Sequence, residues 1–320
     1  MNKEEIKQNF EKAIGLKAQS IKLLGKGASN VNYLIQANNK KFVFRLNANP
    51  KDPKKSIKEF NSLKIIEKLE IGPRPLFLGN NFIILEYIPG TPLIGKKIVT
   101  SRFLKNLARL VARLHSLPPN PSLPREEYRV TNSEAKELLK HLKKNLKDKV
   151  LWKAILESKN QLEKEQSRLN NFKDVREVIT HGDICRQNVL KTTKGLALID
   201  FEDLALRDPA HEIAKIFVDF REPFNGTQKQ VFYDEYFKLR KDETLKERVK
   251  IYERIILFMV FIWSISYCFK IKNKEMHNAF LNKKELKKGF EYVDIMFKRV
   301  IKFDILDKKY SKLDVLGLIK

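Results

Sequence analysis

Cysteine is scarce in this chain, which has only Cys185 and Cys268 among 320 residues. Two cysteines do not make the disulfide framework that is typical of small secreted domains. The two cysteines and five histidines also do not cluster at the spacing of zinc ligands. The sequence therefore argues against a disulfide-rich or zinc-stabilised protein and fits a reducing compartment.

Long hydrophobic segments are lacking as well. The longest apolar run covers residues 255–269, between Arg254 and Lys270, and is shorter than the ~20 residues that span a bilayer. The N-terminal sequence MNKEEIKQNF has no apolar core like that of a signal peptide. We therefore expect a buried core helix at 255–269, no membrane span and a cytoplasmic location.

Acidic residues are in the minority, since 39 of them face 64 basic residues, for a net charge of +25. Such an excess is compatible with a nucleic acid, an anionic membrane surface or an anionic nucleotide as partner. The lysines are spread along the chain without a block of like charge, which favours a general compositional bias. No nucleic-acid-binding motif is present, so a nucleic-acid partner is not favoured.

Apolar residues make up 42% of the chain, enough for a substantial core. Residues 18–48 are rich in β-branched and aromatic side chains and contain a turn-like Ala-Asn-Asn-Lys, which predicts two or more strands. Apolar residues then recur at helical spacing over 57–69, and a short buried strand is predicted at 81–86. The first part of the chain is therefore expected to be small and rich in strands.

Pro89-Gly90 interrupts this pattern and marks a natural boundary. We expect a nucleotide-binding lobe over 1–88 and a catalytic and substrate-binding lobe over 89–320. An amphipathic helix is predicted at 103–114, and the Lys-rich segment 133–170 also has a helical pattern. The second part is therefore expected to be mainly helical.

The polar stretch HGDICRQN, residues 181–188, lies between two short apolar segments that read as strands. Asn188 follows Asp183 by five residues, and the second apolar segment ends at Asp200. Protein kinases place an Asp, an Asn and a second Asp in the same order in H-R-D-x-x-x-x-N and D-F-G. The segment therefore predicts a site for transfer of a γ-phosphoryl group.

The chemistry explains these residue types. Phosphoryl transfer needs positioning and charge neutralisation more than covalent help. We expect Asp183 to accept the proton of the acceptor hydroxyl or to orient it. Mg²⁺ prefers oxygen ligands, which Asn188 and Asp200 supply. Each of the three residues alone is ordinary in a turn or at a strand end, and only the ordered set between apolar strands indicates catalysis.

These motifs, together with LIDFE at 198–202, resemble the aminoglycoside phosphotransferase and choline kinase family. The segments 107–118, LARLVARLHSLP, and 208–214, DPAHEIA, are also similar to that family. The resemblance covers about residues 20–270. It implies an α+β, two-lobed protein-kinase-like fold, with a small antiparallel-sheet lobe and a larger mainly helical lobe. It also implies ATP and Mg²⁺ as cofactors and a small-molecule hydroxyl acceptor.

The resemblance places the nucleotide in the first lobe. The loop over its phosphates corresponds to LGKGASN, with Gly25, Gly27, Ser29 and Asn30 as candidate contacts. Two glycines can occur in any strand turn, so this motif is weak alone.

Four further positions belong to the implied nucleotide site. Arg45 stands where protein kinases have their nucleotide-contacting Lys, and an Arg there is common in the choline kinase branch. Glu59 on the following helix is its implied ion-pair partner. A surface Arg and a solvated Glu are the plainer interpretations. The backbone of Glu86 and Ile88 is expected to bond to the adenine edge.

Three carboxylates, on Glu202, Asp203 and Asp208, follow the expected metal site. They would suit a cationic acceptor, although the net charge of +25 argues mildly against a highly cationic one. Trp263 and Tyr267 lie four residues apart and share a helix face. Such a pair can hold a quaternary ammonium by cation–π attraction, but an aromatic pair on a buried helix is more often part of a core.

Choline or ethanolamine is therefore the favoured acceptor, with an aminoglycoside, homoserine, thiamine or a sugar as alternatives. Two departures from the family pattern keep the acceptor open: Asp203 replaces a frequent aromatic residue, and His211-Glu212 replaces the usual aromatic-Asp pair. A protein of another class, a basic nucleic-acid-binding protein on a degenerate kinase fold, would fit the charge but not the intact catalytic set. The oligomeric state stays open.

Overall fold

The computed structural model describes residues 1–27, 30–48, 54–93, 99–220, 224–275 and 283–319. The chain forms two compact units, each built from several segments. The first unit contains Met1–Glu126, Glu177–Glu212 and Asp219–Asp242, and the second contains Glu127–Arg176, Ile213–Val218 and Glu243–Lys320.

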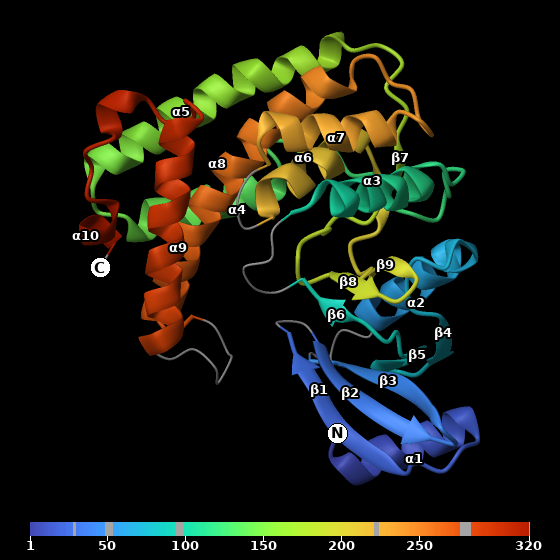
Figure 1. The fold of residues 1–320 in the computed structure, drawn as a ribbon. Coiled ribbons are helices and arrows are strands. Elements are labelled where there is room, and N and C mark those ends of the chain that lie inside the picture. Colours follow the sequence, from blue (N-terminus) through green and yellow to red (C-terminus); the bar gives the residue numbers. More distant parts are fainter. Residues whose placement is uncertain (28–29, 49–53, 94–98, 221–223, 276–282, 320) are drawn as a thin grey trace. The chain divides into compact units, whose positions relative to one another are not determined.

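A five-stranded antiparallel sheet opens the first unit, in the order β1-β2-β3-β5-β4 (Figure 1). Its strands are β1 (Ser20–Lys26), β2 (Asn30–Ala37), β3 (Lys40–Asn47), β4 (Pro75–Leu78) and β5 (Phe82–Glu86). The turn between β2 and β3 places Asn38 at φ 46° and Asn39 at φ 58°. Asparagine tolerates this left-handed region, which two-residue hairpin turns require. The strands and the turn predicted over 18–48 are therefore confirmed.

One face of this sheet is covered by α1 (Lys3–Ile14), as Figure 1 shows. Asn2 begins the helix with a capping box to Glu5, which satisfies backbone N–H groups that would otherwise lack partners. Ile6 and Phe10 are buried against strand residues that include Phe42. The other helical elements near the sheet are α2 (Lys54–Ile66) and the 3₁₀ turn η1 (Glu67–Leu69).

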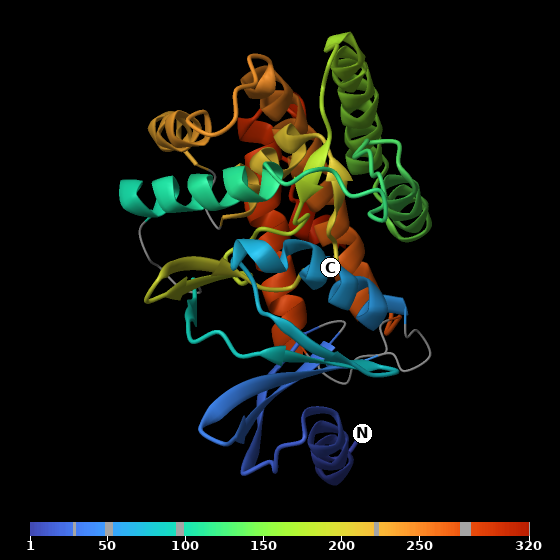
Figure 2. The ribbon, with the colours of Figure 1, turned by 90° about the vertical axis from the view of Figure 1, so that its right-hand side faces the viewer.

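The rest of the first unit combines short strands with helices. Its elements are β6 (Thr91–Pro92), α3 (Ser101–His115), β7 (Val178–Thr180), β8 (Val189–Thr192), β9 (Gly195–Leu198), β10 (Ala205–Arg207) and α7 (Gly226–Tyr236). The strands pair as β6-β8-β9 and β10-β7, and β9 packs against α3 (Figures 1 and 2). α6 (Pro209–Asp219) begins in this unit and contributes Ile213–Val218 to the second.

Helices make up the second unit. They are α4 (Ser133–Asn145), α5 (Lys149–Ser167), η2 (Arg168–Asn171), α8 (Leu245–Lys272), α9 (Lys283–Lys302), η3 (Lys308–Tyr310) and α10 (Val315–Ile319). α8 packs against α4, α5 and α9, and Figures 1 and 2 show α8 and α9 side by side. By length and composition alone α8 could cross a membrane, but 72% of its most apolar window is buried inside the protein. The burial supports the interpretation of 255–269 as a core helix.

An antiparallel N-terminal sheet is thus followed by a mainly helical C-terminal region, and the predicted fold class is confirmed. The helical patterns predicted at 57–69, 103–114 and 133–170 correspond to α2 with η1, to α3, and to α4 with α5. The division into lobes at residue 88 stays a prediction.

Candidate active site

The loop between β7 and β8 brings Asp183 and Asn188 into direct contact. The amide nitrogen Nδ2 of Asn188 donates to the carboxylate Oδ2 of Asp183 at 2.7 Å and to its backbone oxygen at 3.0 Å. Because Nδ2 is committed to Asp183, the carbonyl oxygen of the Asn188 side chain faces away from these bonds. One amide therefore fixes the carboxylate and retains an oxygen that a metal ion can bind.

Asp200 is held next to this loop through the chain that precedes it. The backbone N–H of Ile199 donates to the backbone oxygen of Asn188 at 3.0 Å. His181 joins the same segments, because its Nε2 lies 3.0 Å from the Ile199 oxygen and its Nδ1 accepts from the N–H of Asp183 at 3.2 Å. The three positions predicted from the sequence, Asp183, Asn188 and Asp200, thus belong to one connected site.

Gly182 has no space for a side chain. Its φ of 84° lies in the left-handed region, and an added Cβ would stand 2.7 Å from both Nη1 of Arg207 and the backbone oxygen of Asp203. Arg207 also donates from Nη1 to Thr180 and from Nη2 to Glu126. This close packing fixes the start of the catalytic loop.

The carboxylate of Glu212 is buried next to this loop, and no role in the site was predicted for it from the sequence. Glu212 on α6 is 1% exposed and accepts from the N–H of Gly182 at 2.7 Å. It also contacts Nε2 of His115 on α3 at 2.8 Å. Burial alone would raise the pKa of Glu212, but the hydrogen bond and charge of His115, with the Gly182 amide, keep that pKa lowered. The available signal was a Glu inside an apolar helical segment, since a buried charge needs partners.

Arg45 is the centre of the charge cluster on the sheet side of the site. Its Nε lies 2.7 Å from Glu59 on α2, and its Nη2 bonds to Oδ1 of Asp200 and lies 4.0 Å from Glu202. Arg45 and Glu59 are both buried, at 9% and 4% exposure. The ion pair expected between Arg45 and Glu59 is therefore present, and the plainer interpretation of two solvated surface residues does not apply.

The cluster has three carboxylates for one guanidinium, which affects its protonation. Burial lowers the pKa of Arg45, but the charges of Glu59 and Asp200 outweigh burial and leave that pKa raised. Burial raises the pKa of Glu59 to about 7 despite the opposing effect of Arg45. Burial and the charge of Asp200 also raise the pKa of Glu202. This excess of negative charge favours the arrival of a cation.

The start of β2 reaches the same cluster. Nδ2 of Asn30, the first residue of β2, donates to Oε2 of Glu202 at 3.3 Å. Gly27 donates its backbone N–H to the Asn30 oxygen at 2.8 Å, and Gly25 lies at an irregularity in the pairing of β1 with β2. Ser29, a further expected contact, lies outside the described residues. Glu86 ends β5, two residues before Ile88.

The donor set suits Mg²⁺ held partly by the protein and partly by a phosphate ligand. Asn188 and Asp200 offer hard oxygen atoms, which that ion prefers. Asp200 has a φ of 73°, an uncommon conformation for a non-glycine residue that often marks functional sites. Within the described residues, no group of three or more His, Cys, Asp and Glu side chains could hold a metal alone. A protein-only metal cage is therefore not indicated among them.

The residues expected to bind the acceptor are divided between the two compact units, unlike the residues described above. Asp203 is exposed, and Asp208 caps α6 by accepting from the N–H of Ala210 at 2.8 Å. Trp263 and Tyr267 stack on each other on α8 with ring centroids 5.1 Å apart, and Trp263 is 43% exposed. These two aromatic residues belong to the second unit, whereas Glu202, Asp203 and Asp208 belong to the first. Their roles in acceptor binding stay predictions.

Solved structures with the same fold include both kinds of kinase named by the resemblance. A choline kinase from Cryptosporidium parvum is 18% identical, with a TM-score of 0.69, and 95% of this chain and 98% of that chain are covered. A spectinomycin phosphotransferase, solved with ADP and spectinomycin, is 15% identical, with a TM-score of 0.70 and coverage of 95% and 97%. The choline kinase LicA from Streptococcus pneumoniae is 16% identical, with a TM-score of 0.64, and 94% of this chain and 97% of that chain are covered.

These identities show a shared fold and leave the acceptor open. Among curated protein sequences, no match is found. The model of the phosphotransferase enzyme family matches residues 20–250, which include the whole catalytic segment. The resemblance inferred from the motifs is thereby confirmed, and the chain belongs to the phosphotransferase enzyme family, whose kinase-like fold it has.

Proposed function

We propose that this small-molecule kinase transfers the γ-phosphoryl group of Mg-ATP to a hydroxyl group of choline or ethanolamine. One observation carries the proposal. The Asp183 carboxylate and the Asn188 amide are hydrogen-bonded at 2.7 Å, and Ile199, the residue before Asp200, donates its backbone N–H to the backbone oxygen of Asn188. This combination of a base and two oxygen ligands serves phosphoryl transfer.

In the proposed reaction the hydroxyl oxygen of the acceptor forms a bond to the γ-phosphorus of ATP while the bond from that phosphorus to the β–γ bridging oxygen breaks and ADP leaves. Asp183 accepts the hydroxyl proton. The hydrogen bond from Nδ2 of Asn188 holds the Asp183 carboxylate in one orientation. The carboxylate therefore loses little orientational freedom when the acceptor binds. Bound through Asn188 and Asp200, Mg²⁺ would neutralise charge on the transferred phosphoryl group. His181 and Glu212 keep the loop in register through its backbone.

Arg45 positions the phosphates of the nucleotide in this proposal. A guanidinium that is nine-tenths buried and ion-paired with Glu59 has a restricted direction, which suits contacts with phosphate oxygens. Asn30 at the start of β2 contacts Glu202 of the same cluster, and Gly25 and Gly27 precede it in the chain. Glu86 and Ile88 would bond to the adenine through their backbone.

A cationic acceptor is favoured by the charge around the catalytic carboxylates. Glu202 lies beside Asp200 and Arg45, and Asp203 is exposed next to it. Two negative groups near the base attract a quaternary or primary ammonium at short range. Trp263 and Tyr267 would add a cation–π contact if the acceptor reaches α8. An aminoglycoside, homoserine, thiamine or a sugar is the alternative acceptor, and the cytoplasm is the proposed location.

A panel of acceptors with γ-labelled ATP tests the proposal. Choline, ethanolamine, an aminoglycoside, homoserine, thiamine and a hexose are each incubated with the protein, and label in the product is counted. The expected result is Mg²⁺-dependent labelling with the highest kcat/KM for choline or ethanolamine. Preferential labelling of an uncharged acceptor would contradict the proposed acceptor but not the reaction. Labelling of none of them would contradict both.

A further inference from the structure

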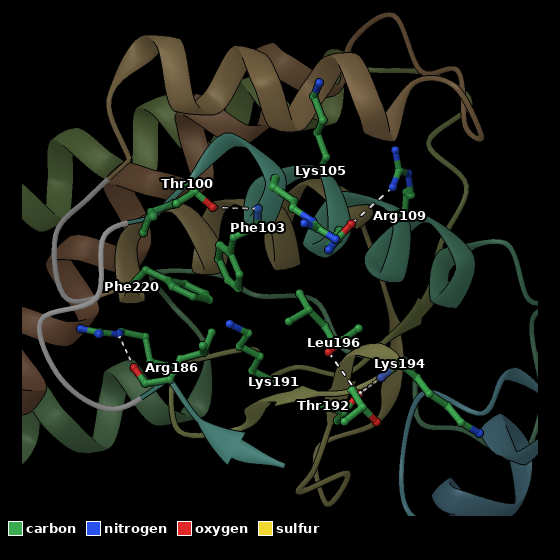
Figure 3. Close-up of a pocket in the computed structure, with 16 residues that line it drawn as sticks. Thr100, Phe103, Lys105, Arg109, Arg186, Lys191, Thr192, Lys194, Leu196 and Phe220 are labelled. Atoms are coloured by element: carbon green, nitrogen blue, oxygen red, sulfur yellow. Dashed lines mark hydrogen bonds between the residues drawn. The ribbon is translucent and has the colours of Figure 1, made fainter. Parts of the chain in front are cut away.

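A second charged region of the first unit plays no part in the proposed reaction. A pocket of about 1200 Å³ lies between the N-terminal half of α3 and the β8–β9 hairpin (Figure 3). None of the residues assigned above to catalysis, metal, nucleotide or acceptor lines it. Its size is in the range that accommodates a small-molecule ligand.

The lining of this pocket is strongly basic. Six cationic side chains and no carboxylate contribute to it among the described residues. The six are Arg102, Lys105, Arg109, Arg186, Lys191 and Lys194. They come from three segments, so the concentration of charge arises from folding and not from a run in the sequence.

Four of these cations have no charged partner among the residues that the structure describes. Arg109 pairs with Glu235, and Arg186 donates from Nε to the backbone oxygen of Leu93. The other four take part in no ion pair with any residue that the structure describes. Some exposed lysines elsewhere, such as Lys153 and Lys298, lie beside a carboxylate. Like charges without counter-charges repel one another, and a bound anion would relieve that repulsion.

The geometry favours an anion inside the pocket over a flat electrostatic surface. In Figure 3 the amine of Lys191 extends from β8 toward Phe103 and Phe220, across the pocket from its own strand. Phe103 and Phe220 lie against each other with ring centroids 5.9 Å apart. A ligand with negative charge and some apolar surface could contact both the Lys191 amine and the two phenyl rings. It would then displace the water around that amine.

We propose that this basic pocket binds a phosphate-bearing ligand with two or more negative charges. Lysine and arginine are the side chains that recognise phosphate oxygens most often. The phosphate can come from a soluble phosphorylated molecule or from the headgroup of an anionic phospholipid, and both sources present the same chemistry. The site is independent of the proposed acceptor, because no residue is shared.

A bound ligand would also contact the catalytic loop. Arg186 lies in that loop, two residues before Asn188. The Leu93 N–H donates to the backbone oxygen of Arg186 at 3.1 Å, and the Arg186 side chain bonds back to the Leu93 oxygen at 2.9 Å. A phosphate that engages Arg186 would thus touch a segment whose position determines that of the metal ligand Asn188.

Calorimetric titration with inorganic tripolyphosphate tests the site, with and without saturating ADP. The pocket variant carries Arg102→Glu and Lys191→Glu. The control variant carries Lys12→Glu and Lys17→Glu. These substitutions change the net charge by the same amount at exposed positions outside the pocket. We expect binding in both ADP conditions, weakened about tenfold or more by the pocket changes, as for the loss of two charge-assisted bonds. The control should lose less than about threefold, because distant exposed charges are screened.

Flotation with vesicles separates the two sources of phosphate. Binding to phosphatidic acid vesicles that depends on the pocket pair identifies a lipid headgroup, and tripolyphosphate binding without vesicle binding identifies a soluble ligand. Equal weakening by the pocket and control pairs overturns the proposal, because it reveals only the general charge of the protein. Loss of binding on adding ADP overturns it as well. If the reversed pair does not fold, Arg102→Gln with Lys191→Gln replaces it.

Discussion

The proposed catalytic residues and the proposed acceptor residues differ in how firmly the protein holds them. Asp183, Asn188 and Asp200 lie in one short stretch of chain that is tied together by side-chain and backbone bonds. Asp208 already caps a helix, and Trp263 stands 43% exposed in another compact unit. Under the proposed function, the contrast implies that bonds within one short segment position the reacting groups, whereas acceptor choice depends on side chains outside those bonds.

Apart from replacement of the proposed base, the largest effect is expected at the metal site. Replacing Asp200 with Asn removes the only carboxylate proposed as a metal ligand, so kcat/KM should fall about 10³-fold. Nucleotide affinity should fall in Mg²⁺ but stay unchanged in EDTA, as equilibrium binding would measure. Asp174→Asn is a matched control, since Asp174 also has a positive φ, 64°, and is exposed. Equal activity of the two variants would remove Asp200 from the mechanism.

A smaller loss is expected when the support under the loop is weakened. Glu212→Gln keeps the shape but loses the charge that His115 and the Gly182 amide contact. We expect kcat to fall about 10- to 100-fold with little change in KM for ATP, as when groups that orient ligands are removed. The exposed Glu291→Gln serves as control. A change confined to the melting temperature, with kcat intact, would show that Glu212 is only structural.

Much of the scaffold follows from local sequence rules, and the remainder does not. β2, β3 and their Asn38-Asn39 turn were predictable because the alternation and the turn residues act within a few positions. β4, β6 and β10 have only two to four residues, too few for a periodic signal. α1 was not predicted, although Asn2 and Glu5 have the spacing of a capping box.

Some residues of the site were also predictable from the sequence, and others were not. The order of Asp183, Asn188 and Asp200 is visible in one segment, and the link between Arg45 and Glu59 came from the family resemblance. The role of Glu212 depends on contacts with α3 and with the loop, which no local pattern encodes. The basic pocket was equally hidden, since its cations come from three separate segments.

A change in stability with pH is expected from Glu59, at a level of about 1–3 kcal/mol. Its folded-state pKa, about 7, lies above the ordinary 4.5, so the folded protein binds this proton more tightly than the unfolded chain. The contribution to the unfolding free energy is therefore complete below pH 4.5 and is lost as pH rises through 7. Denaturant unfolding from pH 4.5 to 8 should show this decline in the wild type and a flatter profile in Glu59→Gln. Parallel profiles would contradict the raised pKa.

The smallest effect is expected at the aromatic pair. Trp263→Ala should raise KM for choline about fivefold with kcat unchanged, in line with the loss of an exposed cation–π contact. Tyr292→Ala, which removes another exposed aromatic residue, should leave KM unaltered. An unchanged KM in the Trp263 variant would assign the stacked pair to packing alone.

The most direct test of the account is the replacement of Asp183 with Asn, because that residue is the proposed base. Single-turnover phosphorylation of the preferred acceptor is measured alongside equilibrium binding of Mg-ATP. We predict a loss of turnover of about 10³-fold or more with nucleotide affinity within about threefold of the wild type. Turnover at the wild-type rate in this variant would contradict the assignment of catalysis to Asp183.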